Sequence, residues 1–300
     1  MSAVTREKGR GPSGVRRFQL RSAGRWRRRT PRSGTVTMVA GVVFGVVLLL
    51  AILGSLITPY GPNAQNLGIG STGPSAGHLL GTDQLGRDIF SRLIVGARTA
   101  VLGPVLIAVA TTALSALLGM IAGFVGGRTD GIISRILDVV YALPPLLVAI
   151  VIVGVLGGGF ALGVLVLIVL SVPAGFRNVR AAALEQRGLP YIESATMLGQ
   201  TNTRIMMHHV LPNIRPMLVA TFFLSFTYGF VDLSTLSFLG LGVAPGTADW
   251  GLMAADSRVL VFSNPLALVA PLALIVIAAV SANLVGQGLD ARSDTTRSDR

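Results

Sequence analysis

The side chains that could carry out chemistry in this chain are few. The sequence contains three histidines, His78, His208 and His209, and no cysteine. Without cysteine there is no thiolate zinc site, iron–sulfur cluster or cysteine nucleophile. Adjacent histidines point to different sides of a helix, so His208 and His209 do not form a shared metal site. The sequence therefore predicts no metal centre and no catalytic cluster.

A nucleotide-binding motif is also missing. The only lysine is Lys8, and the phosphate-binding pattern GxxxxGK followed by Ser or Thr does not occur. We therefore expect no cofactor on this chain, and any ATP hydrolysis must take place on another protein.

Two acidic residues beside apolar runs are the remaining candidates. Asp138 follows Arg135 by three residues, a spacing at which two side chains share one helix face. This favours a structural pair over a proton relay. Asp232 lies near the outer end of an apolar run, where it either faces a transport pathway or reaches the membrane interface.

The composition explains why charged candidates are scarce. Hydrophobic residues make up 51% of the chain and charged residues 13%, against about 25% charged in soluble domains. The net charge of +12 is uneven, because 11 of the 25 basic residues lie between Arg6 and Arg32. A basic segment ahead of the first apolar run is a topology signal, so we expect membrane lipid as a partner and no nucleic acid.

Uncharged runs long enough to cross a bilayer define the elements. A hydrocarbon core of about 30 Å needs about 20 residues of helix. One run, 139–176, is long enough for two helices, with Gly157, Gly158 and Gly159 as the turn. The other runs lie at 36–57, 99–127, 216–231 (extending over Asp232) and 265–286, which gives six spans in all. A cleavable signal peptide is the alternative for the first run, disfavoured by its length and the lack of a cleavage site.

The distribution of basic residues orients these spans. With the amino terminus inside, 21 of the 25 basic residues fall in inner segments, as the positive-inside rule requires. We therefore expect an all-α polytopic membrane protein with six transmembrane helices and both termini cytoplasmic. Its parts are a basic amino-terminal tail at 1–34, a first span at 35–58, an outer loop at 59–96, a core at 97–287 and a cytoplasmic tail at 288–300.

The longest inner connection, 177–215, has the pattern of a helical hairpin. Pro190 suits a first helical turn, Glu193 complements the helix dipole, and Gly199 ends the helix before a second one at 203–210. Such a hairpin presents a compact surface to a soluble partner. The alternative is an amphipathic helix pair lying on lipid headgroups.

This loop has the residue order of a known motif. The sequence Glu193-Ser194-Ala195, then Gly199, then His209-Val210-Leu211-Pro212 resembles the EAA loop of binding-protein-dependent ABC importer permeases. Ser194 stands where that family has alanine, and His209 where it often has isoleucine. The resemblance implies that the loop forms a coupling helix, which docks in a groove of an ATPase subunit.

Two outer segments are similar to the C-type permeases of the dipeptide, oligopeptide and nickel importers. One runs from His78 to Arg92 and continues with Gly96-Ala97-Arg98; the other comprises 236–242 and Asp249-Trp250-Gly251. From the residues alone, 89–97 is an interfacial helix with one apolar face, which could dock on a partner. The alternative is that its charged residues only pair with each other and order the loop. The family motif in the first segment comprises Gly81, Thr82, Asp83, Gly86, Arg87 and Asp88.

The resemblance implies a permease subunit of an ABC importer in a prokaryotic cytoplasmic membrane. Its partners would be a second homologous permease, two ATPases that hold ATP and Mg, and an extracytoplasmic substrate-binding protein. Peptides are the expected cargo, with nickel chelates, glutathione or another small solute as alternatives. A secondary transporter is disfavoured, because the sequence shows neither paired buried carboxylates nor convincing repeats. A membrane enzyme is disfavoured, because the sequence shows no catalytic cluster.

Overall fold

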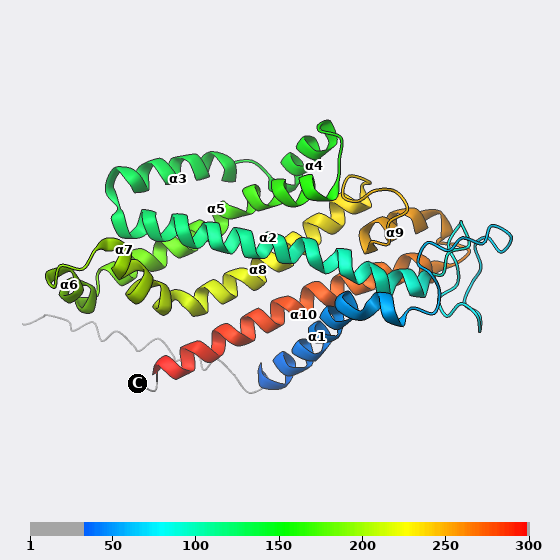
Figure 1. Ribbon diagram of the computed structural model, residues 1–300, viewed down its shortest axis with the longest axis horizontal. Coiled ribbons are helices and arrows are strands. Elements are labelled where there is room, and N and C mark those ends of the chain that lie inside the picture. The colour runs from blue at the N-terminus through cyan, green and yellow to red at the C-terminus, as the bar shows by residue number, and fades with distance from the viewer. Residues whose placement is uncertain (1–32, 299–300) are drawn as a thin grey trace, which may run out of the picture. The chain divides into compact units, whose positions relative to one another are not determined.

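The computed structural model describes residues 33–298, with side chains from 34 to 289. The predicted basic tail, 1–34, therefore lies outside the described residues except for its last two. Within the described part every regular element is a helix (Figure 1), which confirms the all-α prediction. The elements are α1 (Ser33–Ile57), α2 (Ile89–Val125), α3 (Gly127–Tyr141), α4 (Pro145–Val155), α5 (Phe160–Arg187), α6 (Pro190–Met197), α7 (Asn202–Ile205), the π-helical segment η1 (Met206–Val210), α8 (Leu211–Phe238), α9 (Trp250–Asp256), the 3₁₀ turn η2 (Ser257–Leu260) and α10 (Pro265–Ser298).

The membrane-spanning elements are five continuous helices and one bent pair. In the described residues, α1, α2, α5, the continuous helix formed by α7, η1 and α8, and α10 are each long and apolar enough to cross a bilayer. Helices α3 and α4 pass the same test only together, and they are bent by 76° at the break between them. The six predicted spans thus correspond to five helices plus this bent pair.

The third span differs from the prediction, which placed a single helix from residue 139. Helix α3 already begins at Gly127 and carries charged residues, and α4 has only 11 residues. The break follows from Pro144 and Pro145, because proline lacks a backbone donor and disfavours a helical conformation at the residue before it. The predicted glycine turn at 157–159 lies between α4 and α5, and all three glycines have positive φ.

The prediction of a separate interfacial helix at 89–97 is wrong. These residues form the first turns of α2, which continues without a break to Val125. Both faces of the segment are buried: Leu93 and Ala97 on the apolar side, and Ser91 and Arg92 on the polar side. The segment is therefore part of the helix bundle.

Several helices continue beyond the apolar runs that predict them. Helix α5 extends 11 residues past Phe176, because the Ala, Leu, Glu, Gln and Arg residues that follow are strong helix formers. Helix α10 continues to Ser298, through most of the predicted tail at 288–300. At about 1.5 Å per residue, the 37 residues of α2 span about 55 Å, so its ends project past a hydrocarbon core of about 30 Å.

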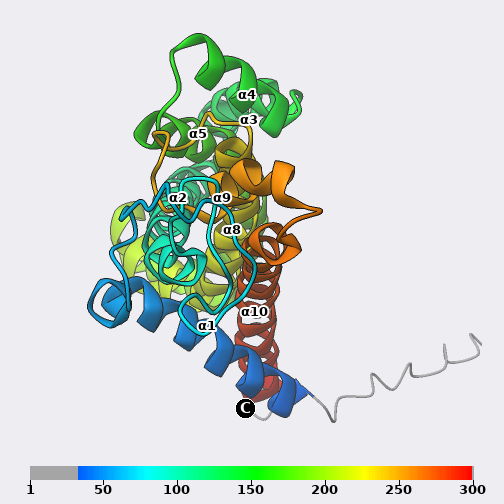
Figure 2. The same ribbon diagram turned by 90° about the vertical axis from the view of Figure 1, so that its right-hand side faces the viewer.

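Helix α2 is the central packing element, and it contacts α1, α5 and α8. Small residues permit its closest contacts: a Cβ at Gly119 or Gly123 would collide with Val179 or the Arg180 carbonyl of α5. Viewed along the bundle in Figure 2, α1 and α10 lie on one flank and α3 and α4 on the opposite flank. In Figure 1, α6 and α7 lie at one end of the bundle, and α9 with the 58–88 loop lies at the other.

Candidate functional site

Helix α6 is a short helix anchored on the ends of the long ones. Its first residue, Pro190, follows Leu189, whose extended backbone begins the helix. Ile192 and Ala195 are buried and belong to a cluster drawn from α2, α5, α7, η1 and α8. The underside of α6 is thus fixed by apolar packing; the other buried members of the cluster are Met120, Phe124, Val179, Ala183, Ile205, Val210 and Ile214.

The turn after α6 is closed by a Schellman motif. Gly199 has a φ of +73°. Its backbone N–H donates to Thr196 O at 3.0 Å, and the Gln200 N–H donates to Ala195 O at 3.2 Å. This pairing requires a left-handed residue at Gly199, for which glycine carries no Cβ penalty. The helix therefore ends where the sequence predicts.

The tip of this hairpin is exposed and partly apolar. Met197 and Leu198 are 87% and 80% exposed. Glu193 and Ser194 are also exposed on the outer surface of α6. Two neighbouring large apolar side chains beside a carboxylate form a small knob that a protein groove can cover.

A hydrogen-bond network joins the hairpin to two long helices. The Tyr191 hydroxyl donates to Gln186 Oε1 of α5 at 2.6 Å and accepts from Asn213 Nδ2 of α8 at 2.8 Å. His209 Nε2 lies 3.2 Å from Gln200 Oε1, which ties η1 to the turn. These bonds join the hairpin to both α5 and α8.

The hairpin enters α8 through the π-helical segment η1. Pro212 has no backbone N–H, so it cannot donate a hydrogen bond to the preceding turn. The wider π turn of η1 carries the chain into α8 at this point. Leu211 packs at the edge of the apolar cluster. The predicted residues 193–195, 199, 209, 211 and 212 therefore lie in one hairpin, with the first two on its outer surface and Ala195 in its base.

Asp138 pairs with a different residue from the one predicted. Its carboxylate accepts from Arg177 of α5 at 2.7 Å, and Arg135 is not its partner. About two turns earlier in α3, Asp130 accepts from Arg180 at 2.6 Å. Both pairs tie the otherwise unburied α3 to α5. The partner of Asp138 is Arg177 and not the predicted Arg135, and a structural pair in preference to a proton relay stays a prediction.

The outer-loop motif forms an internal network. Asp83 accepts from the backbone N–H of Leu85 and Arg87 and from Arg87 Nε at 2.6 Å. Asp88 caps α2 by accepting from the Ser91 N–H and bonds His78 Nδ1 at 2.9 Å. Gly81 and Gly86 have positive φ, and the Thr82 hydroxyl donates to the Gly70 carbonyl at 2.7 Å. These buried side chains order the loop, which was the alternative to docking.

Arg92 links the two outer loops. It is 1% exposed, and its guanidinium donates to the carbonyl oxygens of Pro62 at 3.0 Å, Thr247 at 3.1 Å and Gly246 at 3.3 Å. Sequence spacing does not reveal this role, because the partners of Arg92 lie about 30 residues before it and more than 150 residues after it.

The second outer segment is held by Trp250 and Asp249. Trp250 Nε1 donates to Leu93 O at 2.8 Å. Asp249 caps α9 by accepting from the Leu252 N–H. Burial raises the pKa of the Asp249 carboxyl, although the backbone N–H groups of Leu252 and Gly251 partly oppose the shift.

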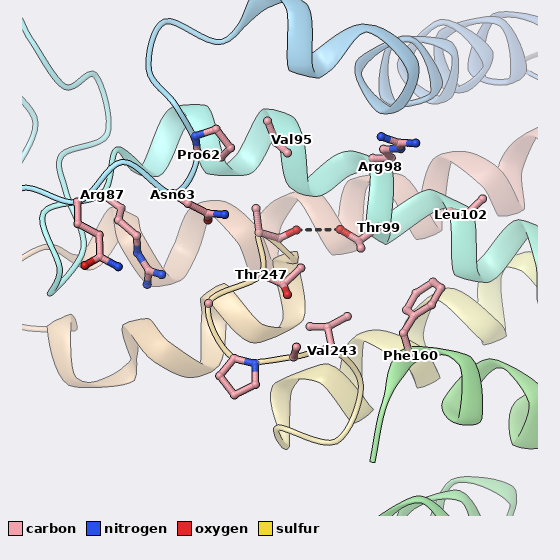
Figure 3. A pocket seen from close by; sticks show the side chains of 15 residues that line it. Pro62, Asn63, Arg87, Val95, Arg98, Thr99, Leu102, Phe160, Val243 and Thr247 are labelled. Carbon is pink, nitrogen blue, oxygen red and sulfur yellow. Dashed lines mark hydrogen bonds between the residues drawn. The ribbon is translucent and has the colours of Figure 1, made fainter. Parts of the chain in front are cut away.

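A hollow of about 860 Å³ opens between these outer loops and α2 (Figure 3). Its wall holds Arg98 and Thr99, and the Thr99 hydroxyl donates to Ala248 O at 2.8 Å. Leu102, Phe160 and Val243 give it an apolar side. Arg98 has no ion pair or hydrogen bond among the described residues. The volume lies within the range of small-molecule sites.

The last candidate, Asp232, lies in α8 and is half-buried. It lines a separate hollow of about 310 Å³ between α5, α8 and the α3–α4 bend. In the part of the chain that the structure describes, no three His, Cys, Asp or Glu side chains are placed to hold a metal ion.

Family models match the chain on both sides of the outer loop. Residues 115–296 match the model described as binding-protein-dependent transport system inner membrane component. Residues 32–74 match the N-terminal TM domain of oligopeptide transport permease C. The first match covers the hairpin and α5 to α10, and the second covers α1 and the start of the outer loop.

Curated relatives are similar over most of the chain. The di/tripeptide transport system permease protein DppC of Pseudomonas aeruginosa is 36% identical over 84% of this chain and 85% of the relative. The oligopeptide transport system permease protein OppC of Bacillus subtilis is 34% identical over 86% and 85%. The glutathione transport system permease protein GsiD of Pectobacterium atrosepticum is 34% identical over 85% of each chain.

A solved structure shares the fold. A chain of the MetNI methionine ABC transporter, in an inward-facing conformation, aligns with a TM-score of 0.53 at 17% identity. The alignment covers 68% of this chain and 97% of that one.

Proposed function

Because the chain belongs to the family of binding-protein-dependent transport system inner membrane components, the permeases of bacterial ABC importers, we propose that it forms half of a peptide pathway. A second homologous permease supplies the other half, and two ATPase subunits and an extracytoplasmic binding protein complete the assembly. Relatives named for di/tripeptides, oligopeptides and glutathione support a cargo of a few amino acid residues. A nickel chelate or another small solute is the alternative cargo.

The observation that carries the proposal is the asymmetry of α6. Its underside is packed and hydrogen-bonded to the long helices, whereas Met197 and Leu198 at its tip are exposed. A groove on an ATPase subunit would cover this tip. Closure of the ATPases on ATP then moves α6, and the Tyr191 network passes the displacement to α5 and α8, which shifts the pathway between inward and outward access.

The test uses a single cysteine, because the natural chain has none. Met197→Cys places a thiol at the tip, and Val259→Cys, which is also exposed, places one near α9 at the other end of the bundle. With a short thiol-to-amine crosslinker in native membranes, we expect the first variant to capture an ATPase subunit and the second to capture none. Capture from neither position, or from both equally, would exclude α6 as the docking element.

The orientation is part of the same proposal. If α6 meets a cytoplasmic ATPase, the carboxyl end of α10 is cytoplasmic, because it lies at the same end of the bundle as α6. With six crossings, the amino end of α1 is on the same side. A reporter fused after Arg300 should be active only as a cytoplasmic fusion. Periplasmic activity would reverse the topology.

A further inference from the structure

Helix α8 carries a stripe of polar side chains along one face. Thr221, Ser225, Tyr228 and Asp232 are spaced by four, three and four residues, so they lie on one helix face. Asp232 is the only acidic residue of α8. A carboxylate within a membrane helix is rare and is by default a candidate functional group.

The stripe faces polar groups of a neighbouring helix across a hollow. Ser171 and Asn178 of α5 line the same space of about 310 Å³ as the α8 residues. The two helices are held close at this wall, since a Cβ at Gly175 would lie 3.4 Å from Thr221 Cγ2. Tyr141 and Pro145 close the side formed by the α3–α4 bend.

Within residues 34–289, Asp232 is half-buried and has no partner, whereas the unpaired Glu185 and Glu193 are exposed. Asp83, Asp88, Asp130 and Asp138 are each paired with an arginine or a histidine. Among the described residues Asp232 has neither an ion pair nor a hydrogen bond. The charge is therefore left for a group from outside this chain.

We propose that Asp232, with the Tyr228 hydroxyl one helical turn away, binds the primary ammonium group of the transported solute within the membrane. The carboxylate and this hydroxyl accept two of the three donors of an ammonium group. A divalent cation needs about six oxygen ligands and usually more than one carboxylate, which this wall does not supply. The hollow is at the small end of ligand sites, so it fits the amino end of a peptide and not a whole oligopeptide.

This inference rests on the proposed peptide import, and the experiment separates the two. The complete transporter, with its second permease, ATPases and binding protein, is reconstituted in proteoliposomes. Uptake of Ala-Ala and of N-acetyl-Ala-Ala is measured per ATP hydrolysed, at peptide concentrations that give equal occupancy of the binding protein. The variants are Asp232→Asn and Asp232→Glu. Asp256→Asn, the same chemical change outside the hollow, is the control.

We expect Asp232→Asn to lower Ala-Ala uptake per ATP by about tenfold or more, the loss of one charge-assisted contact. N-acetyl-Ala-Ala uptake should change by less than about twofold, since the acetylated end carries no charge. Asp232→Glu should keep Ala-Ala uptake within about threefold of wild type, and Asp256→Asn should leave both peptides unchanged.

Three results would overturn the inference. Equal losses for both peptides, or equal losses in the Asn and Glu variants, would show a structural role for Asp232. Wild-type uptake of Ala-Ala by Asp232→Asn would show no role in transport. If Asp232→Asn fails to assemble, Tyr228→Phe is used in its place, because it removes one hydroxyl from an exposed ring. It should lower Ala-Ala uptake about threefold more than N-acetyl-Ala-Ala uptake. A wild-type assembly that hydrolyses ATP without peptide uptake would instead refute the proposed function.

Discussion

Substitutions at Gly199 separate the geometry of the hairpin turn from the contact that its tip makes. A Cβ at this position meets nothing within 4 Å, so the cost of a side chain is only that of the left-handed backbone. For alanine that cost is about 1–2 kcal/mol, which can lower the population of the turn by at most about 5- to 30-fold. Asparagine and aspartate visit this conformation more readily and cost less.

The backbone treats asparagine and aspartate alike, but the proposed contact of the tip with an ATPase subunit distinguishes them. Aspartate has the shape of asparagine, but it adds a negative charge at the carboxyl end of α6, worth about 0.3–1 kcal/mol against the helix dipole. It also places that charge next to Met197 and Leu198, which lose water when they dock. We therefore expect Gly199→Asn to keep stimulated ATP hydrolysis within about threefold and Gly199→Asp to lower it by at least about tenfold.

The assay is ATP hydrolysis by the assembled transporter with and without its binding protein, together with recovery of ATPase subunits on the tagged permease. Membrane insertion should be equal for Gly199→Asn, Gly199→Ala and Gly199→Asp. Equal hydrolysis and equal recovery for the asparagine and aspartate variants would refute the reasoning, because charge at the tip would then have no effect on docking.

Three further predictions concern stability, each measured by thermal unfolding in detergent. Arg92→Met leaves three carbonyl oxygens without their donor and should destabilise the protein by about 3 kcal/mol or more, so an unchanged midpoint would contradict the network. Because burial raises the pKa of Asp249, its contribution is present below the unfolded pKa and is lost as pH rises through the folded pKa. Asp249→Asn keeps the cap and should be at least as stable as wild type at about pH 7, an advantage that disappears on acidification. Arg180→Gln removes a two-bond, partly buried pair and should cost about 1–2 kcal/mol, whereas Arg177→Gln removes an exposed pair and should cost under about 1; equal costs would be inconsistent with the different exposure.

The sequence predicts the helical class and most spans, because uncharged runs report directly on the length of a bilayer crossing. It mislocates α3 and the start of α2 for the same reason. Both contain charged residues, so a search for uncharged runs starts after Asp138 and Arg98. In α3, Arg128, Arg135 and Asp138 are exposed and Asp130 is half-buried against Arg180. In α2, Arg92 is buried against carbonyl oxygens from distant loops.

The candidate site divides in the same way. The hairpin turn is predictable because Pro190 and Gly199 act within their own few residues. The network of Gln186, Tyr191 and Asn213 is not, since its members are up to 27 residues apart and join three helices. Nearest-neighbour spacing likewise assigns Arg135 to Asp138, whereas the true partner is 39 residues away.

The way Arg92 makes its contacts bears on how the outer face of the protein can change. Most of its hydrogen bonds are to main-chain oxygens, which every amino acid supplies. The residues at 62 and 247 can therefore be exchanged without losing the link between the loops, whereas Gly246 is held by its φ of +85°. One buried cation thus lets side chains on the outer face vary without rebuilding the frame beneath it.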